Sequence, residues 1–115
     1  MFHWLSRLFA KPVKRSPERQ RQVDEESNSL ILYYFPLCPY CHRVNRVVRR
    51  LSLNIEHRNA ARSTEWADEL LHGGGKMQVP CLRMRRPEGN EWLYESEDII
   101  RFLRQRFATS EDFPT

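Results

Sequence analysis

Hydrophobic positions along the chain follow two repeats in turn, one typical of strands and one typical of helices. The continuous apolar run at 30–35 predicts a strand that is buried on both faces. Over 40–53 the apolar residues instead recur every three or four positions, which predicts the first helix. A second short strand is predicted at 55–58. A strand, a helix and another strand in this order predict a parallel crossover unit.

The second half of the chain continues this alternation. Its predicted elements are a helix at 64–71, strands at 79–84 and 91–94, and a helix at 96–107. The glycines at 73–75 end the first of these helices, because glycine readily takes the left-handed conformation found just past a helix end. Pro, Gly and Asn within 85–90 are typical of a hairpin turn, and Ser96 is a good N-cap for the last helix. The order β-α-β-α-β-β-α predicts an α/β fold with a mixed four-stranded sheet flanked by helices.

The residues before the first strand have a different composition. Residues 11–29 carry prolines, charges and polar side chains with few apolar residues, which predicts a linker or a flexible lead-in. Before them, apolar residues recur at near-helical spacing among basic ones: Phe2, Leu5, Leu8 and Phe9, with Arg7, Lys11, Lys14 and Arg15. This pattern fits a short amphipathic membrane anchor. A frayed terminus or a helix packed loosely on the domain is favoured instead, because the segment is only about three turns long.

The expected organisation is therefore an extension at 1–29, flexible or a short amphipathic helix, one domain at 30–108, and a tail at 109–115. With 115 residues and a hydrophobic fraction of 40%, the chain can form one domain. No apolar run approaches the roughly 18 residues that span a bilayer. Three cysteines are too few for a disulfide-stapled secreted scaffold, so we expect a cytoplasmic protein with reduced thiols.

The formal charge of +4 reflects 19 basic and 15 acidic residues, a balance that can favour acidic partners. Arginines crowd two predicted elements, at positions 43, 46, 49 and 50 and at positions 83, 85 and 86. No motif of nucleic-acid recognition accompanies them. They are interpreted as a solvated basic surface, and no nucleic-acid partner is expected.

The residues that carry chemistry are Cys38-Pro39-Tyr40-Cys41, which follow the first strand and open the first helix. Two thiols at this spacing and junction are typical of a dithiol redox centre. Cys38 is the expected nucleophile, because unpaired N–H groups and the helix dipole stabilise a thiolate at a helix amino terminus. Cys41 lies one turn further in and should be shielded, so that it either resolves a mixed disulfide or stays aside.

Two other interpretations of the cysteine pair have less support. The cysteines could merely pack, but they lie in a Pro-Tyr turn and not on the apolar stripe of the helix. They could bind zinc with further Cys and His residues of the chain, but no second pair has the spacing of a zinc finger. No metal is therefore expected.

Three motifs together resemble the glutaredoxins. Cys38-Pro39-Tyr40-Cys41, Val79-Pro80 and Tyr94-Glu95-Ser96 stand in the order found there, and the match covers about 30–108. It is most similar to glutaredoxins related to the amino-terminal domain of glutathione transferases. The resemblance implies a thioredoxin-like fold and makes glutathione the co-substrate.

The resemblance also assigns roles to single residues. It implies a cis bond before Pro80 and a backbone pairing of Val79 with the cysteinyl part of glutathione. It implies that Glu95 and Ser96 hold the γ-glutamyl carboxylate, which agrees with a helix amino terminus as an anion site.

Further residues fit the pattern less closely. Tyr40 packs over the peptide or is simply an exposed turn residue. Many glutaredoxins have a lysine shortly before the pair, whereas 35–37 supply no charge, so the Cys38 thiolate would depend on the helix and on neighbours such as Arg43, His42 or Lys76. Cys81 is expected to point into the sheet as a small apolar residue.

The sequence therefore predicts a glutathione-dependent oxidoreductase of the glutaredoxin type, which reduces protein disulfides or protein–glutathione mixed disulfides. Its partners would be glutathione and client protein disulfides. A non-catalytic glutathione-binding or protein-interaction module is one alternative. An iron–sulfur carrier, in which Cys38 thiolates of two subunits share a cluster with glutathione, is another, and Pro39 disfavours it because the cluster-binding relatives usually lack that proline.

Overall fold

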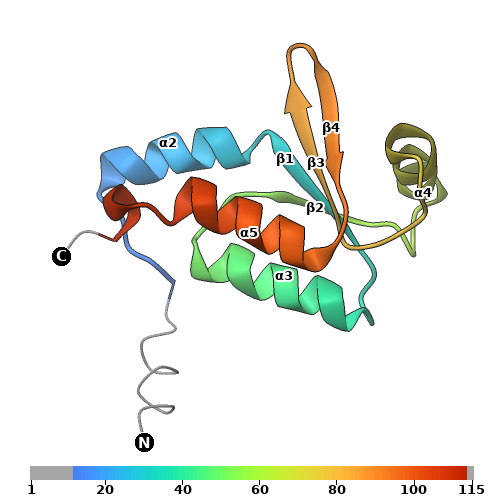
Figure 1. The fold of residues 1–115 in the computed structure, drawn as a ribbon, viewed down its shortest axis with the longest axis horizontal. Coiled ribbons are helices and arrows are strands. Elements are labelled where there is room, and N and C mark those ends of the chain that lie inside the picture. Colours follow the sequence, from blue (N-terminus) through green and yellow to red (C-terminus); the bar gives the residue numbers. More distant parts are fainter. Residues whose placement is uncertain (1–11, 114–115) are drawn as a thin grey trace, which may run out of the picture.

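The fold is built around strand β1 (Leu30–Tyr34), seen in the computed structural model, which describes residues 12–113 (Figure 1). Successive side chains of a strand point to opposite faces of the sheet. Leu30 and Leu32 accordingly join the larger of two buried clusters, and Ile31 and Tyr33 join the smaller. Burial on both faces explains why this segment is apolar without interruption.

The other strands flank β1 in one mixed sheet of order β2-β1-β3-β4. Strand β2 (Glu56–Asn59) pairs parallel to β1, and β3 (Cys81–Arg86) pairs antiparallel to it. Strand β4 (Gly89–Leu93) pairs antiparallel to β3 and forms one edge. The predicted mixed four-stranded sheet is confirmed.

Helices cover both faces of this sheet. Helices α3 (Pro39–Arg50) and α5 (Ser96–Phe107) lie side by side on one face and bury their apolar stripes in the larger cluster (Figure 1). Helix α4 (Thr64–Asp68) and the π-helical segment η1 (Glu69–Gly74) cover the other face, where Leu70 is fully buried. The arrangement is the predicted thioredoxin-like α/β fold.

Helix α3 ends at Arg50, three residues before the predicted end. Ser52 has a left-handed φ of 52°, its N–H donates to Arg49 O (3.1 Å), and the Leu53 N–H donates to Val48 O (3.1 Å). This is a Schellman motif, which closes a helix with two backbone bonds. Serine rarely adopts this conformation, so the apolar pattern alone extends the predicted helix too far.

The glycines at 73–75 act differently from the prediction at two of three positions. Gly75 has a φ of 91° and ends η1 as expected. Gly73 and Gly74 instead belong to η1 and let it approach the sheet, since a Cβ on Gly74 would lie 2.0 Å from Tyr94 Oη. Close packing, more than turn geometry, is what these two positions require.

The hairpin between β3 and β4 is longer than predicted. Pairing continues to Arg86 opposite Gly89, so that only Pro87 and Glu88 form the turn. Strand β3 also starts at Cys81 and not at position 79, because Pro80 has no N–H to donate to the ladder.

The expected flexible lead-in over 11–29 is wrong for most of that segment. Pro17–Ser27 form helix α2, with Ser16 as N-cap and Val23 fully buried in the larger cluster. The segment is held by buried charge and not by an apolar stripe, since Arg15 Nε contacts Asp112 Oδ1 at 2.5 Å. Asp112 belongs to the 3₁₀ helix η2 (Ser110–Asp112), so the two ends of the domain are joined.

The remaining expectations for the extension concern the apolar positions between Phe2 and Phe9, which lie outside the described residues. Within 12–113, no helix is both long enough and apolar enough to cross a membrane.

Candidate functional site

Cys38 lies at the junction that the sequence predicts, as the N-cap of α3. Its backbone is extended (φ −97°, ψ 112°), and Pro39 occupies the first helical position, where no N–H is needed. The Cys41 N–H donates to Cys38 Sγ over 3.2 Å. A sulfur held at the positive end of a helix dipole and bonded to a backbone N–H is well placed to carry negative charge.

The two thiols of the pair differ sharply in environment. Cys38 is half-buried, whereas Cys41 is 3% exposed. Burial, and next its interaction with Cys38, raises the pKa of the Cys41 thiol to about 12. The expected shielding of Cys41 is thus present, and only Cys38 offers an accessible sulfur. All three cysteines of the chain are free thiols in this structure.

The charged neighbours proposed from the sequence are engaged elsewhere. His42 Nε2 lies 2.6 Å from Pro36 O, and Arg43 pairs with Glu97. Lys76 Nζ lies over the Tyr94 ring, 5.2 Å from its centroid. Within residues 12–113, the hydrogen bond to Cys38 Sγ comes from the Cys41 backbone alone. Of the two sources expected from the sequence, the helix terminus therefore contacts the Cys38 sulfur, whereas the three side chains contact other groups.

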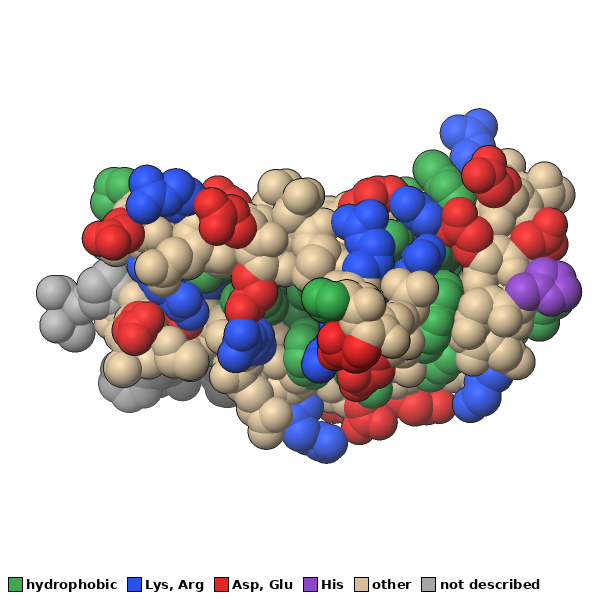
Figure 2. All heavy atoms as spheres, turned by 90° about the horizontal axis from the view of Figure 1, so that it is seen from above, with side chains coloured by type: hydrophobic (Ala, Val, Ile, Leu, Met, Phe, Trp, Pro, Cys, Tyr) green, Lys and Arg blue, Asp and Glu red, His purple; other side chains and the backbone are tan. Residues whose placement is uncertain are grey.

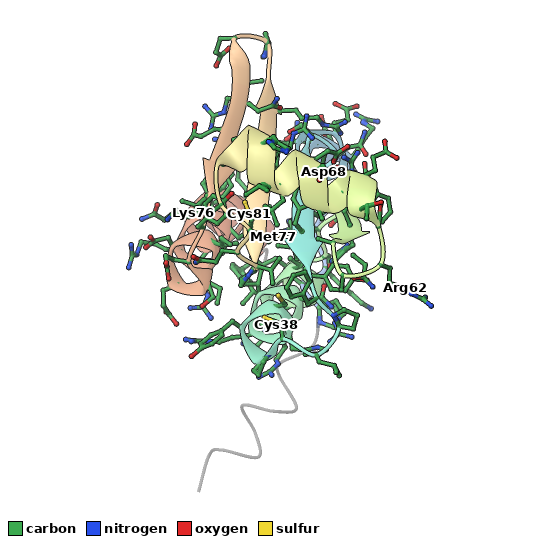
Figure 3. All side chains as sticks on the ribbon, turned by 90° about the vertical axis from the view of Figure 1, so that its right-hand side faces the viewer. Cys38, Arg62, Asp68, Lys76, Met77 and Cys81 are labelled. Carbon is green, nitrogen blue, oxygen red and sulfur yellow. The ribbon has the colours of Figure 1, made fainter. Side chains whose placement is uncertain are left out.

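Strand register brings the other predicted segments to the same end of the sheet. Tyr33 of β1 pairs with Cys81, the first residue of β3, so Val79 and Pro80 lie beside the carboxyl end of β1, just before Cys38. Leu82 pairs with Leu93, which brings residues 94–96 to this end as well. Figure 3 views this end, with Cys38, Lys76 and Met77 labelled. The cis bond implied by the resemblance is confirmed at Val79–Pro80.

Side-chain contacts join the loop before β3 to the segment before α5. Gln78 Nε2 donates to Glu95 Oε1 over 3.2 Å, and the Tyr94 hydroxyl donates to Lys76 O over 3.0 Å. These bonds and the strand register bring Lys76, Val79, Pro80, Glu95 and Ser96 together as one group of loop residues, to which sequence reasoning did not assign Gln78. The sequence feature that could have pointed to Gln78 is its position directly before Val79-Pro80.

The cysteine pair and this group meet through apolar packing. Phe35 accepts the Cys38 N–H over 3.2 Å, and both Phe35 and Val79 pack against the smaller buried cluster. Within 12–113, no hydrogen bond links the cysteine pair directly to Lys76, Val79, Pro80, Glu95 or Ser96. The two parts are fixed relative to each other by the sheet and its core.

The start of α5 corrects the predicted cap. Glu95 is the N-cap, and its left-handed φ of 69° is rare for a residue with a Cβ. Ser96 is the first helical residue and is buried. The backbone bonds of the helix begin with the Ile99 N–H donating to Glu95 O, so the three preceding N–H groups have no helical acceptor. Such a terminus attracts a carboxylate.

Apolar side chains around Cys38 are unusually exposed. Leu37 is 94% exposed, Tyr40 62% and Met77 47%. Tyr40 was predicted as either a contact for the peptide or an exposed turn residue, and its exposure fits both. Leu37 and Met77 were not predicted, because nothing in the local pattern shows that a loop leaves them uncovered.

Cys81 lies in the sheet as expected, with no exposed surface. Burial raises the pKa of its thiol to about 12, so it is a poor nucleophile. Within 12–113, no three His, Cys, Asp or Glu side chains gather as a group that could hold a metal ion.

Comparison with known proteins identifies the family of this domain. The family model of the glutathione S-transferase N-terminal domain matches residues 32–111. Comparison with curated protein sequences gives no significant match.

Solved structures share the fold at low sequence identity. A trimeric glutathione transferase of Leishmania is 24% identical with a TM-score of 0.54, over 69% of this chain and 18% of that one. The Omega 2S transferase of Trametes versicolor is 21% identical with a TM-score of 0.56, over 76% of this chain and 40% of that one. The buckwheat glutaredoxin–glutathione complex is 19% identical with a TM-score of 0.50, over 77% of each chain.

The chain thus spans less than half the length of these transferases, and its likeness to them is a likeness of the thioredoxin-like domain. Because the family model covers most of the chain, the protein belongs to the family of glutathione S-transferase N-terminal domains, with the thioredoxin-like fold that this family shares with glutaredoxins.

Proposed function

We propose that the protein is a glutathione-dependent thiol–disulfide oxidoreductase in which Cys38 is the nucleophile. The observation that carries the proposal is the contrast between an accessible Cys38 at a helix amino terminus and a buried Cys41 whose pKa is raised to about 12. A thiol that exchanges disulfides must be both ionised and reachable. Of the three cysteines, only Cys38 has an accessible sulfur, and its place at a helix amino terminus favours a thiolate.

Glutathione would bind across the group formed by Lys76, Val79, Pro80, Glu95 and Ser96. The Val79 backbone would pair with the cysteinyl part of the peptide, while the free N–H groups at the start of α5 and Ser96 would hold the γ-glutamyl carboxylate. Tyr40 and Lys76 would flank the peptide. Membership of a glutathione S-transferase family and the likeness to a glutaredoxin–glutathione complex support glutathione as the ligand.

The reaction begins with attack of the Cys38 thiolate on the glutathione sulfur of a protein–glutathione disulfide. The Cys38–glutathione disulfide forms, the bond to the client breaks, and the client leaves as a thiolate that takes a proton from water. A second glutathione thiolate then attacks the glutathione sulfur bound to Cys38. Oxidised glutathione leaves, and the Cys38 thiolate is restored.

Cys41 is not required in this sequence of steps. Its burial and its raised pKa both slow attack on the Cys38–glutathione disulfide. We therefore propose that the one-thiol route carries most of the turnover with glutathionylated clients. Reduction of a disulfide within a client would still need Cys41 or a second glutathione to release Cys38.

Three serine variants test the proposal with a glutathionylated protein as substrate and glutathione as reductant. Cys38→Ser should lose turnover to the uncatalysed level, because the attacking sulfur is gone. Cys41→Ser should retain most of it, and the matched control Cys81→Ser should behave like the wild type. Turnover by Cys38→Ser equal to the wild type would overturn the assignment, and glutathione binding without turnover in the wild type would identify a binding module instead.

A further inference from the structure

The chain enters helix α3 through a tight turn. The Cys38 N–H donates to Phe35 O over 3.2 Å and closes a four-residue turn with Pro36 and Leu37 in its middle. Proline suits the second position of such a turn, because its ring fixes φ at about −65°. Pro36 and Leu37 are both exposed, Leu37 at 94%. The two middle residues of the turn are therefore not held by burial.

Helices often fix the chain before them with a hydrophobic staple. The staple is an apolar contact between the residue before the N-cap and the fourth helical residue. With Cys38 as the N-cap of α3, these two positions are Leu37 and His42. The exposure of Leu37 and the polar ring of His42 show that this pair of residues does not form the apolar contact. The turn before Cys38 must be fixed in another way.

His42 forms a hydrogen bond in place of that contact. Its Nε2 lies 2.6 Å from Pro36 O. A carbonyl oxygen can only accept, so Nε2 carries a hydrogen and donates it. The His42 backbone N–H also donates to Cys38 O over 3.1 Å. His42 therefore holds the chain on both sides of Leu37, by its side chain before it and by its backbone after it.

The position of His42 in the helix makes this bond possible. Side chains of a helix point back toward its amino terminus, so the fourth helical residue can reach the loop that precedes the helix. Within residues 12–113, His42 provides the only side-chain hydrogen bond to Pro36 or Leu37. The bond also leaves the Leu37 side chain free beside Cys38.

We propose that His42 is a positioning residue, which orients the Cys38 sulfur by fixing the turn before it. The inference rests on the proposed function, because orientation matters only if Cys38 attacks a disulfide. The hydrogen bond to the sulfur comes from the Cys41 N–H and not from His42, so His42 acts through the backbone and does not move a proton. A displacement of about 1 Å at a reacting atom can cost about a hundredfold in rate, so a loosened turn should be measurable.

Two amide substitutions separate the hydrogen bond from the imidazole ring. In His42→Gln the amide nitrogen takes the place of Nε2 and can still donate to Pro36 O, whereas in His42→Asn it lies near the place of Nδ1 and falls short. Both are made in a Cys41→Ser/Cys81→Ser background, which leaves a single thiol. The control His72→Asn changes an exposed histidine of η1, in the α4–η1 segment at the right-hand end of the molecule in Figure 1 and in Figure 2.

Two reactions of Cys38 are compared. With oxidised glutathione, the Cys38 thiolate attacks one sulfur, a Cys38–glutathione disulfide forms, and the other glutathione leaves as a thiolate that takes a proton from water. Iodoacetamide is small and approaches from any direction, forming an S–C bond with loss of iodide. His42→Asn should slow the first reaction about tenfold and the second by less than about twofold, and His42→Gln should restore the first. His72→Asn should match its parent in both reactions.

Several results would overturn the role of His42. These are an unchanged rate with oxidised glutathione in His42→Asn, an equal loss in both reactions, which would indicate an effect on ionisation or exposure of the thiol, and an equal loss in His42→Gln, which would assign the effect to the ring. NMR of the wild-type ring should show a hydrogen on Nε2, and a hydrogen on Nδ1 alone would exclude the bond whether or not the chain uses glutathione. A parent that does not react with oxidised glutathione would overturn the proposed function, and the role of His42 with it. Melting curves of all variants should match, because both histidines are exposed.

Discussion

The two ends of the sheet differ in the kind of ion pair that they contain. One pair is buried and the other is exposed to solvent. At the end where β1 begins, Arg15 and Asp112 form an ion pair whose side chains are both 0% exposed, and this pair joins segments 97 positions apart. At the end where Cys38 lies, the ion pair between Arg43 and Glu97 is more than half exposed on each side. Leu37 and Tyr40, which flank Cys38 in the sequence, are exposed apolar side chains. The first end is closed by buried charge, whereas the second holds the proposed site and its exposed side chains.

This difference separates the end that should contribute more to stability from the end that holds the proposed site. Removing one partner of a buried ion pair is strongly destabilising, because the remaining charge is left without water and without a partner. An exposed pair depends little on its partner, because water solvates both groups. Residues 12–29 and 109–113, which the sequence suggests are accessory, therefore belong to the structural end of the domain.

The largest expected effect comes from Asp112→Asn. The substitution leaves the Arg15 charge buried without its partner, which should lower the free energy of unfolding by about 3–5 kcal/mol in urea denaturation. Turnover per folded molecule should not change, because Cys38 lies at the other end. Replacing both partners, in Arg15→Met/Asp112→Leu, should cost much less. A loss below about 1 kcal/mol in Asp112→Asn would show that the pair is effectively exposed.

Lowering the pH should weaken the ion pair between Arg15 and Asp112 gradually, because Asp112 becomes protonated. Burial alone would raise the pKa of Asp112, but hydrogen bonds from Arg19, the Thr109 N–H and Arg15 outweigh it and hold the pKa well below its usual range. A lowered carboxyl pKa adds stability that is present above the unfolded pKa of 3.8 and is lost as the pH falls toward the folded pKa. Melting temperatures between pH 5 and pH 2 should therefore fall more steeply in the wild type than in Asp112→Asn. Parallel curves would contradict the lowered pKa.

The closed end is also where sequence reasoning fails. Helix α2 buries only Val23 and Ser27, so it has no apolar stripe from which a helix could be predicted. Its anchor, Arg15 with Asp112, joins distant residues that no local pattern connects. Strand β1 and helices α3 and α5 were predictable because their apolar repeats match the residues that they bury.

The site was predictable in its residue types but not in its geometry. The cysteine motif indicates a thiol at a helix start, and that position is confirmed. The left-handed backbone of Glu95 and its bond from Gln78 depend on how two loops meet, so neither follows from local propensity. Leu37 and Met77 are exposed for the same reason, because packing between segments decides which apolar residues stay uncovered.

A smaller effect is expected at the open end from Gly74→Ala. The new methyl group would lie 2.0 Å from Tyr94 Oη, and overpacking of this kind should cost about 1–3 kcal/mol in the free energy of unfolding. Displacement of Tyr94 should also weaken its bond to Lys76 O and raise the KM for glutathione.

The matched test for Gly74→Ala is the same change in a Tyr94→Phe background, which lacks the clashing oxygen. The substitution should cost less there, and the difference measures the clash. An equal cost in both backgrounds would show that η1 does not depend on its close approach to Tyr94.

The smallest effect should follow from Glu97→Gln, which breaks the exposed pair with Arg43. Because water solvates both groups, the loss in unfolding free energy should be about 0.2–1 kcal/mol and should shrink further as salt is raised. The comparison with Asp112→Asn is direct, since both substitutions turn a carboxylate into an amide opposite an arginine. Urea denaturation of the two variants at low and high salt therefore isolates the effect of burial. Equal losses would mean that burial does not distinguish the two ends, whereas a small, salt-sensitive loss in Glu97→Gln alone would assign the stability to the buried pair.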